Sequence, residues 1–158
     1  VASRSKFDEI ATGNLWGSSE SLSGAGSEIA RTERYRQSLV QLVRDRGFRS
    51  MFDAPCGDLN WMHLALEKLD LDYVGGDISP ALIAMNRERF PDLKFVEFDI
   101  TNDPFPTADV WHCRDCLFHL SYRGVDLTEV DQIRTFRDGS MDGGFLQVWS
   151  LTGTKLNA

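Results

Sequence analysis

The chain has 158 residues, of which 42% are hydrophobic and 26% are charged, and this composition fits one globular domain. It holds too many apolar residues for an intrinsically disordered chain, and its three cysteines are too few for a secreted disulfide scaffold. No apolar run approaches the roughly 18 to 20 residues of a membrane span, and the N-terminal residues contain no apolar signal core. We therefore expect a soluble, cytoplasmic protein.

The balance of charges disfavours nucleic acid as a partner. There are 17 Lys and Arg residues against 24 Asp and Glu residues, so the net charge is −7 and phosphate groups would meet a repulsive background. The arginines between Arg31 and Arg49 alternate with apolar positions, as they do on the solvated face of a helix. We expect a partner that is neither nucleic acid nor membrane, and the sequence does not indicate an oligomeric state.

The N-terminal segment differs in composition from the rest of the chain. Eight of the eleven residues from Gly17 to Ser27 are Ser or Gly, which is typical of a loop or a mobile arm. Trp16 comes directly before this stretch, and a free tail has little reason to carry a tryptophan. We therefore predict that residues 1–27 form an arm or lid, part of which folds over an α/β domain of residues 28–158.

After the arm, segments with the hydrophobic period of a helix alternate with short apolar runs that are typical of strands. Ser27 is a candidate N-cap for a helix that ends near Gly47, and Ser79-Pro80 is a candidate start for a helix that runs through Phe90. Further helices are predicted over residues 59–69 and 126–137, and strands over residues 51–53, 73–77, 93–98, 108–113 and 145–151. This alternation predicts βαβ units in a doubly wound, mostly parallel α/β sheet, with residues 145–151 as its fifth strand.

Acidic residues close three of the predicted strands. Asp53, Asp77 and Asp99 stand at positions where open parallel sheets bind ligands, outside the carboxyl ends of the strands. A carboxylate there can accept two hydroxyl hydrogen bonds from a ribose, or an N–H hydrogen bond from a base. The alternative is that each aspartate only starts a turn or caps the next helix. Three in succession nevertheless favour a nucleoside-shaped crevice.

The loop after the first predicted strand is poorly suited to phosphate. Its sequence, D-A-P-C-G-D over residues 53–58, lacks G-x-G-x-x-G, has a single glycine at Gly57 and adds a negative charge at Asp58. Acidic groups around the loop would instead stabilise an ammonium or sulfonium charge. The loop thus favours a ligand with a ribose and a cationic tail.

Taken together, these motifs resemble the class I S-adenosylmethionine-dependent methyltransferases, and in particular a bacterial subset. In that subset a W-G-S-x-E-S-x-S-G-x-G-S arm precedes a D-A-P-C-G-D-x-x-W-M loop, and here the two motifs begin at Trp16 and Asp53. Further matches follow in the same order at residues 76–78, 99–101, 113–116 and 119–121. The resemblance extends from about Phe7 to Ser121.

The resemblance implies a Rossmann-like methyltransferase fold, S-adenosylmethionine as cofactor and a small-molecule or saccharide-like acceptor. It implies that Asp53 and Gly57 lie beside the methionine part of the cofactor and that Asp77 holds the ribose hydroxyls. The remaining cofactor residues would be Trp16 in the arm, Ile78 against the adenine, Asp99 and Ile100 at the adenine amino group, and Arg114 at the mouth shared with the acceptor.

Two residues are candidates for catalysis, and a pair of cysteines indicates an alternative, a metal or redox site. An oxygen or nitrogen acceptor must lose a proton, and Asp115 and His119 are the nearby groups that could take it, although His119 could equally be a packed side chain. Cys113 and Cys116, with Cys56, His112 and His119, could instead form a metal or redox site. The sequence supplies no second ligand pair, so we interpret the cysteines as small buried thiols and expect no metal.

The resemblance departs from the family pattern after Ser121. Sheets of this family normally carry seven strands and a terminal β-hairpin that helps to wall the acceptor pocket. Residues 145–151 are expected to be only the fifth strand, and little sequence remains for a hairpin, so the fold is expected to be truncated there. A non-catalytic S-adenosylmethionine-binding or regulatory module with a degenerate acceptor site therefore stays open as an alternative function.

Overall fold

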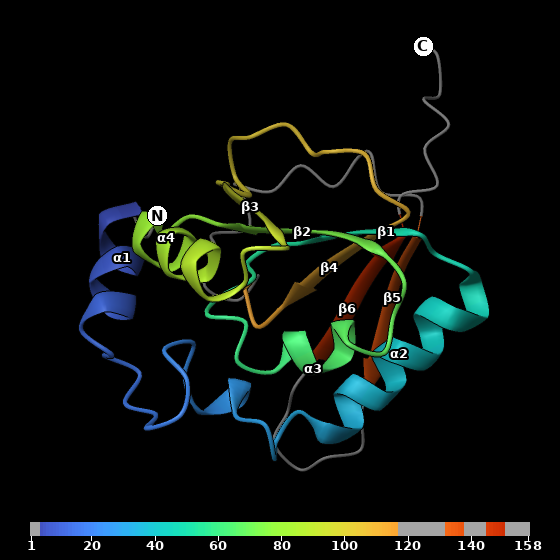
Figure 1. The fold of residues 1–158 in the computed structure, drawn as a ribbon, viewed down its shortest axis with the longest axis horizontal. Coiled ribbons are helices and arrows are strands. Elements are labelled where there is room, and N and C mark those ends of the chain that lie inside the picture. The colour runs from blue at the N-terminus through green and yellow to red at the C-terminus, as the bar shows by residue number, and fades with distance from the viewer. Residues whose placement is uncertain (1–3, 117–131, 138–144, 151–158) are drawn as a thin grey trace.

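The computed structural model describes residues 4–116, 132–137 and 145–150, and a six-stranded sheet forms its centre (Figure 1). The strand order is β3-β2-β1-β4-β6-β5. Four strands run parallel to one another: β1 (Ser50–Asp53), β2 (Asp72–Asp77), β3 (Lys94–Glu97) and β4 (Val110–Arg114). The predicted α/β class and the mostly parallel sheet are therefore confirmed.

The other two strands correct the prediction for the C-terminal part. Residues 126–137 were expected to be helical, but residues 132–137 form strand β5 (Gln132–Arg137), while residues 126–131 lie outside the described ranges. Strand β6 (Phe145–Ser150) pairs antiparallel with both β4 and β5. The expected fifth strand is thus the sixth, and an antiparallel pair occurs where no hairpin was expected. Strand β6 is distant in sequence from its partner β4, and the local hydrophobic period does not indicate which strands pair.

The predicted end of one helix and the predicted start of another are confirmed, whereas a third predicted helix boundary is wrong. Gly47 ends helix α2 (Glu33–Arg46) in a left-handed conformation with φ of 64°. Ser79 caps helix α4 (Pro80–Arg89), because its hydroxyl accepts a hydrogen bond from the Leu82 N–H. Helix α2, however, begins after Thr32 rather than after Ser27. Ser27 ends a short 3-10 turn, η1 (Ala25–Ser27), and its carbonyl accepts a hydrogen bond from the Asn60 side chain.

Helix α3 (Met62–Leu66) is shorter than the predicted helix over residues 59–69. Leu59 has φ of 57°, a left-handed conformation that a branched side chain rarely adopts and that interrupts a right-handed helix. The helix can therefore begin only after this residue. The buried Leu59 side chain packs in the core and holds the loop in that conformation.

The two faces of the sheet have different cores. Helices α2, α3 and α4 cover one face, where Leu39, Met62 and Ile83 pack with the strand residues Met51 and Val110. Side chains alternate across a strand, so the next residues along β1 and β4, Phe52 and Trp111, point to the opposite face. There they pack with Phe98, Phe105 and Ala108 from the segment that connects β3 to β4.

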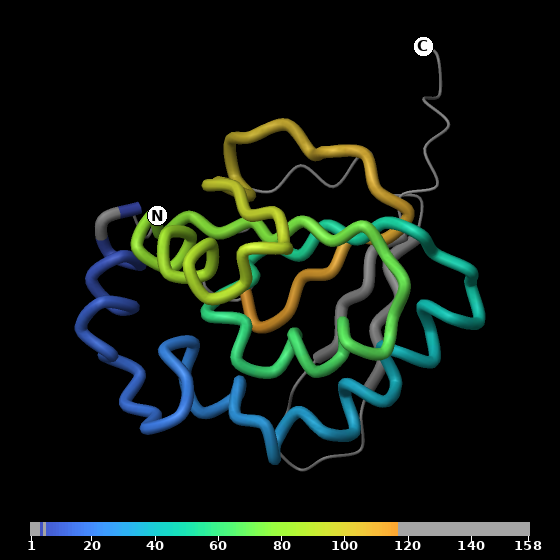
Figure 2. Tube along the Cα trace, viewed as in Figure 1, coloured from blue at the N-terminus to red at the C-terminus, as the bar shows by residue number. Residues whose placement is uncertain are grey.

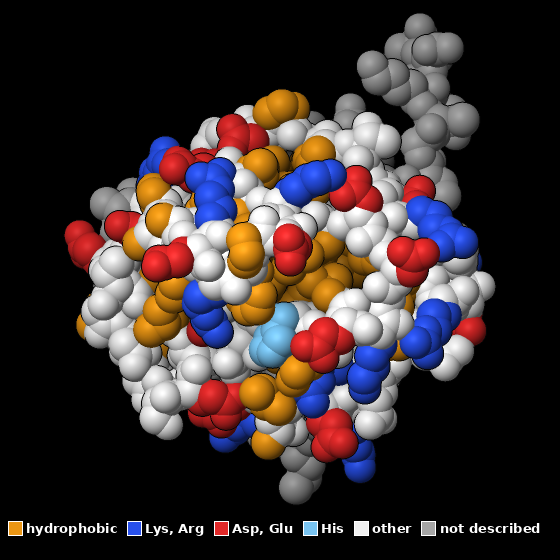
Figure 3. Space-filling model, in the orientation of Figure 1, with side chains coloured by type: hydrophobic (Ala, Val, Ile, Leu, Met, Phe, Trp, Pro, Cys, Tyr) orange, Lys and Arg blue, Asp and Glu red, His pale blue; other side chains and the backbone are white. Residues whose placement is uncertain are grey.

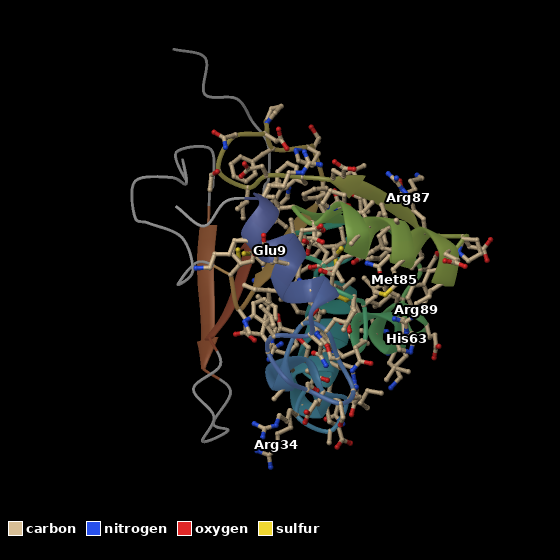
Figure 4. All side chains as sticks on the ribbon, turned by 90° about the vertical axis from the view of Figure 1, so that its left-hand side faces the viewer. Glu9, Arg34, His63, Met85, Arg87 and Arg89 are labelled. Carbon is tan, nitrogen blue, oxygen red and sulfur yellow. The ribbon has the colours of Figure 1, made fainter. Side chains whose placement is uncertain are left out.

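Helix α1 (Arg4–Thr12) was not predicted, and it packs against α4. The Asp8 carboxylate accepts hydrogen bonds from the Ser79 hydroxyl and the Ala81 N–H, a favourable place for a negative charge at the start of α4. Figure 2 shows the chain passing from α1 around the outside of the molecule to α2. In the side view, α1 with Glu9 lies toward the viewer, and Arg87 and Arg89 of α4 lie on the side remote from β5 and β6 (Figure 4).

The described surface carries mixed charges. On the face shown in Figure 3, Lys and Arg side chains alternate with Asp and Glu side chains around patches of apolar ones. Within the three described ranges, no helix combines the length and the apolar character that a membrane crossing requires.

Candidate cofactor and active site

A cavity of about 330 Å³ lies at the carboxyl ends of the parallel strands. This volume is within the range of roughly 300 to 1,000 Å³ that is usual for small-molecule sites. The cavity is lined by all eight residues predicted to bind the cofactor: Trp16, Asp53, Gly57, Asp77, Ile78, Asp99, Ile100 and Arg114. Asp115 lines it as well, whereas His119, the other candidate for catalysis, lies outside the described residues.

Asp77, the last residue of β2, presents a nearly buried carboxylate to the cavity. Its Oδ1 accepts a hydrogen bond from the Ser79 N–H and its Oδ2 accepts one from the Gly57 N–H, each at 3.0 Å. Burial disfavours the charged form and raises the pKa of Asp77 to about 6, although these backbone donors oppose the rise. The Ile78 N–H also acts on this carboxylate, which can accept about four hydrogen bonds in all, so acceptor capacity for a ligand remains.

Asp53, the last residue of β1, is held by two other side chains and is 2% exposed. Its Oδ1 lies 2.5 Å from His112 Nδ1, and its Oδ2 accepts a hydrogen bond of 2.6 Å from the Tyr73 hydroxyl. The other nitrogen of the His112 ring lies 2.5 Å from the Tyr35 hydroxyl. Helix α2 and strands β4, β1 and β2 therefore contribute to one buried hydrogen-bonded network: Tyr35, His112, Asp53 and Tyr73.

Asp99 lies two residues beyond the end of β3, and most of its hydrogen-bonding capacity is used locally. Its Oδ1 accepts from the N–H and the hydroxyl of Thr101, and its Oδ2 accepts from the Asn102 side chain. These hydrogen bonds lower the pKa of Asp99 against the opposing effect of partial burial. About one acceptor position of this carboxylate remains for a ligand.

The loop 53–58 has a role that the sequence interpretation missed. Asp58 was seen only as a negative charge near the cofactor, but it is buried and holds the N-terminal arm. Its Oδ1 accepts from the Ser21 and Ser23 hydroxyls at 3.0 Å each, and its Oδ2 accepts from the Leu22 N–H at 2.7 Å. Gly57 has φ of 58°, and a Cβ there would lie 2.2 Å from the Ser23 hydroxyl oxygen.

Arg114 and Asp115 form the wall of the cavity at the end of β4. The Arg114 guanidinium pairs with the Asp115 carboxylate at 3.0 Å and donates a hydrogen bond to the Gly26 carbonyl of the arm. It also lies over the rings of Tyr35 and Trp61, at 5.1 Å and 5.6 Å from their centroids. Asp115 has φ of 53°, a strained conformation of the kind that occurs at functional sites.

Among the described residues, the cysteines are not part of a cluster that could bind a metal ion. In the described part of the chain, no group of three or more His, Cys, Asp or Glu residues could hold a metal ion. Burial raises the pKa of the Cys56 thiol, and a hydrogen bond with Cys116 together with burial raises the pKa of the Cys113 thiol. Both thiols therefore stay protonated at neutral pH and are poor nucleophiles.

The comparisons with known proteins agree with this architecture. The family model described as "Methyltransferase domain" matches residues 52–135, which is more than half of the chain. The chain therefore belongs to this methyltransferase family, and membership implies S-adenosylmethionine as the cofactor. The arm of residues 1–27 lies outside the matched residues. No curated protein matches the chain.

Solved structures are similar to this chain at low sequence identity, and the first of the three described here shows the same fold. A protein of Methanococcus maripaludis, assigned as an S-adenosyl-L-methionine-dependent methyltransferase, is 11% identical with a TM-score of 0.54, and the match covers 83% of this chain and 96% of that one. A TehB-like SAM-dependent methyltransferase from Corynebacterium glutamicum is 15% identical with a TM-score of 0.46, over 77% and 98%. DesVI of Streptomyces venezuelae is 21% identical with a TM-score of 0.38, and the match covers 44% of this chain but only 30% of DesVI.

Proposed function

We propose that this chain transfers a methyl group from S-adenosylmethionine to a small-molecule or saccharide-like acceptor, and that the cofactor binds in the cavity at the strand ends. Membership of the methyltransferase family supports the reaction class. The observation that carries the choice of site is Asp77, a buried carboxylate with spare acceptor capacity, which faces a cavity of suitable volume. When bound, the cofactor supplies a methyl group on a positively charged sulfur.

The lining of the cavity fits the parts of this cofactor. The acceptor capacity left on Asp77 would serve the hydroxyls of a ribose. The apolar side chains of Ile78, Phe98 and Ile100 line the same cavity and could pack against the adenine of the cofactor. The one acceptor position left on Asp99 could bind the amino group of the adenine. Gly57 would lie near the cofactor through its Cα, because its N–H already donates to Asp77 and its carbonyl already accepts a hydrogen bond from the Asn86 side chain.

Asp115 is our proposed acceptor of the proton that the substrate loses. It lines the cavity, is partly exposed, and is oriented by its ion pair with Arg114. His119 remains the second candidate from the sequence. Because methyl transfer is an in-line displacement without a covalent enzyme intermediate, the other residues act mainly by holding the reacting atoms in place. We place the protein in the cytoplasm. We exclude nucleic acid as acceptor, because the net charge of −7 would repel phosphate groups.

The arm of residues 1–27 acts, in this proposal, as a lid over the cofactor. Trp16, Ser23 and Ser27 line the cavity, and Asp58 and Arg114 hold the arm from the side of the core. A lid excludes water from the reacting groups. Limited proteolysis tests this role, because cleavage between Gly17 and Ser27 should slow when S-adenosylhomocysteine is added. Equal cleavage rates with and without the ligand would leave the arm as a static part of the fold.

Calorimetry tests the cofactor assignment. S-adenosylhomocysteine should bind more tightly than NAD, since the loop 53–58 offers no cradle for a pyrophosphate. Tighter binding of NAD would overturn the proposal.

A methyl-transfer assay with candidate acceptors, read by mass spectrometry, tests the catalytic assignment. Asp115→Asn should lose turnover and keep cofactor binding, whereas the double variant Cys113→Ser/Cys116→Ser should keep the rate within about tenfold. The opposite pattern would assign the chemistry to the thiols. Cofactor binding without turnover on any acceptor would instead indicate a non-catalytic binding module.

A further inference from the structure

The buried network of Tyr35, His112, Asp53 and Tyr73 has no assigned role, and its hydrogen bonds determine its charge. Burial raises the pKa of both tyrosine hydroxyls, so both keep their protons at neutral pH. The Tyr73 hydroxyl donates to Asp53 Oδ2. His112 Nδ1 faces the other Asp53 oxygen and must carry a proton to bond with it.

The remaining question is the protonation of His112 Nε2, which faces the Tyr35 hydroxyl. If Nε2 is unprotonated, it accepts the Tyr35 proton, and each of the three donors in the network has one acceptor. If Nε2 is protonated, the Tyr35 proton needs another acceptor, and none occurs among the hydrogen bonds of the described residues. A buried hydroxyl without an acceptor is unfavourable. The pairing therefore favours a neutral His112 with its proton on Nδ1.

With a neutral His112, the network carries one negative charge, and this charge resides on Asp53. Asp53 lines the cavity and lies beside Asp77, whose charged form its own charge disfavours. Arg114, a positive group that also lines the cavity, is already paired with Asp115. A bound cation would therefore stabilise the charged forms of the two neighbouring carboxylates at the ends of β1 and β2.

We propose that the network holds Asp53 as a fixed negative charge that selects the sulfonium form of the cofactor over the neutral thioether left after methyl transfer. This inference rests on the proposed function. In the reaction, the bond between methyl carbon and sulfur breaks with its electron pair staying on sulfur. A lone pair of the acceptor forms the new bond to carbon, and the acceptor's proton passes to a base. The cofactor thereby loses its sulfonium charge, and with it the attraction to Asp53, which favours release of the product.

Calorimetry with both forms of the cofactor separates a charge effect from a loss of shape. Asp53→Asn, which removes the charge at nearly constant volume, should raise the ratio of the Kd for S-adenosylmethionine to the Kd for S-adenosylhomocysteine by about tenfold. Asp72→Asn removes an equal charge at the exposed start of the same sheet and should leave the ratio within twofold. An unchanged ratio in Asp53→Asn, with both ligands still binding, overturns this inference and leaves the proposed function intact. If neither ligand binds the unmodified protein, the proposed function itself fails.

Nitrogen NMR of the unmodified chain with labelled histidine tests the network without any ligand. The sequence contains only three histidines, and His112→Gln assigns the signal of interest. We expect His112 at pH 7 in the neutral form with the proton on Nδ1. A doubly protonated ring would neutralise Asp53 and overturn the inference, whatever the effect of Asp53→Asn on folding.

Discussion

Asp58 and Asp77 are both buried carboxylates beside the cavity, yet they differ in the number of donors around them. Among the described residues, Asp58 accepts two hydroxyl and two N–H hydrogen bonds, which fill its capacity, and three of these come from the N-terminal arm. Asp77 accepts two N–H hydrogen bonds and a weaker contribution from the Ile78 N–H, and it keeps acceptor capacity for a ligand. The donors already present, rather than burial or position after a strand, thus decide whether a carboxylate is used up in anchoring the chain or keeps capacity for a ligand.

Removal of the Asp58 carboxylate should have the largest effect on stability. Asp58→Ala leaves the Ser21 and Ser23 hydroxyls and the Leu22 N–H without their acceptor, so the free energy of unfolding should fall by about 3 kcal/mol. Urea unfolding measures this loss, and proteolysis between Gly17 and Ser27 should become faster. The exposed Asp92→Ala variant is the control and should unfold like the unmodified chain. Unchanged proteolysis in Asp58→Ala would mean that other contacts hold the arm.

Removal of the Asp77 carboxylate should chiefly affect the ligand. Asp77→Ala should weaken binding of S-adenosylhomocysteine by roughly 1 to 3 kcal/mol, because two ribose hydroxyls lose their acceptor. Calorimetry gives the dissociation constants, and Asp72→Ala, at the opposite and exposed end of β2, serves as the matched control. An unchanged dissociation constant for Asp77→Ala would place the ribose elsewhere in the cavity.

The titration of Asp77 should make cofactor binding depend on pH. Its pKa of about 6 means that the carboxylate is charged above pH 6 and accepts both hydroxyls, whereas below pH 6 it carries a proton. Affinity for S-adenosylhomocysteine should therefore fall as the pH drops through 6, by up to about tenfold per unit. The ligand-free protein should respond in the opposite sense, since a pKa raised above its ordinary value of 3.8 costs stability as the pH rises from about 4 to 6. A pH series of calorimetric titrations should show this slope, and the slope should vanish in Asp77→Ala.

Asp99 should give the smallest effect of the four. Three of its acceptor positions are occupied by Thr101 and Asn102, so a ligand can use only one. Asp99→Asn should therefore weaken binding of S-adenosylhomocysteine by less than about 1 kcal/mol. A loss as large as that of Asp77→Ala would show that the local hydrogen bonds open when the ligand binds.

The sequence predicted those features that depend on neighbouring residues. Gly47 ends a helix because it adopts a left-handed conformation without strain, and Ser79 with Pro80 starts one through a local side-chain cap. Alternation of apolar residues located the strands, and parallel pairing then brought Asp53 and Asp77 to one edge of the sheet. The gathering of seven of the eight predicted cofactor residues around one cavity follows from this arrangement, whereas the eighth, Trp16, comes from the arm.

The predictions that failed depended on partners outside the segment itself. Strand β5 was expected to be a helix, because its pairing with β6 is not visible in its own periodicity. Helix α2 begins later than expected, since Ser27 is engaged by Asn60, which lies 33 residues away. Helix α1 was missed, and its Asp8 carboxylate binds Ser79 and Ala81 at the start of α4, more than 70 residues away.

By itself, the sequence determined the fold class, the methyltransferase family and the set of residues at the strand ends, because hydrophobic period and motif order are properties of adjacent residues. Only the tertiary structure decided how each acidic group is used. Asp53 is bound by His112 and Tyr73, Asp58 by the arm, and Asp77 by two backbone N–H groups, from partners that are up to 59 residues distant in the chain. The capacity of a carboxylate for a ligand depends on how many such donors the fold brings to it, and no local pattern records that number.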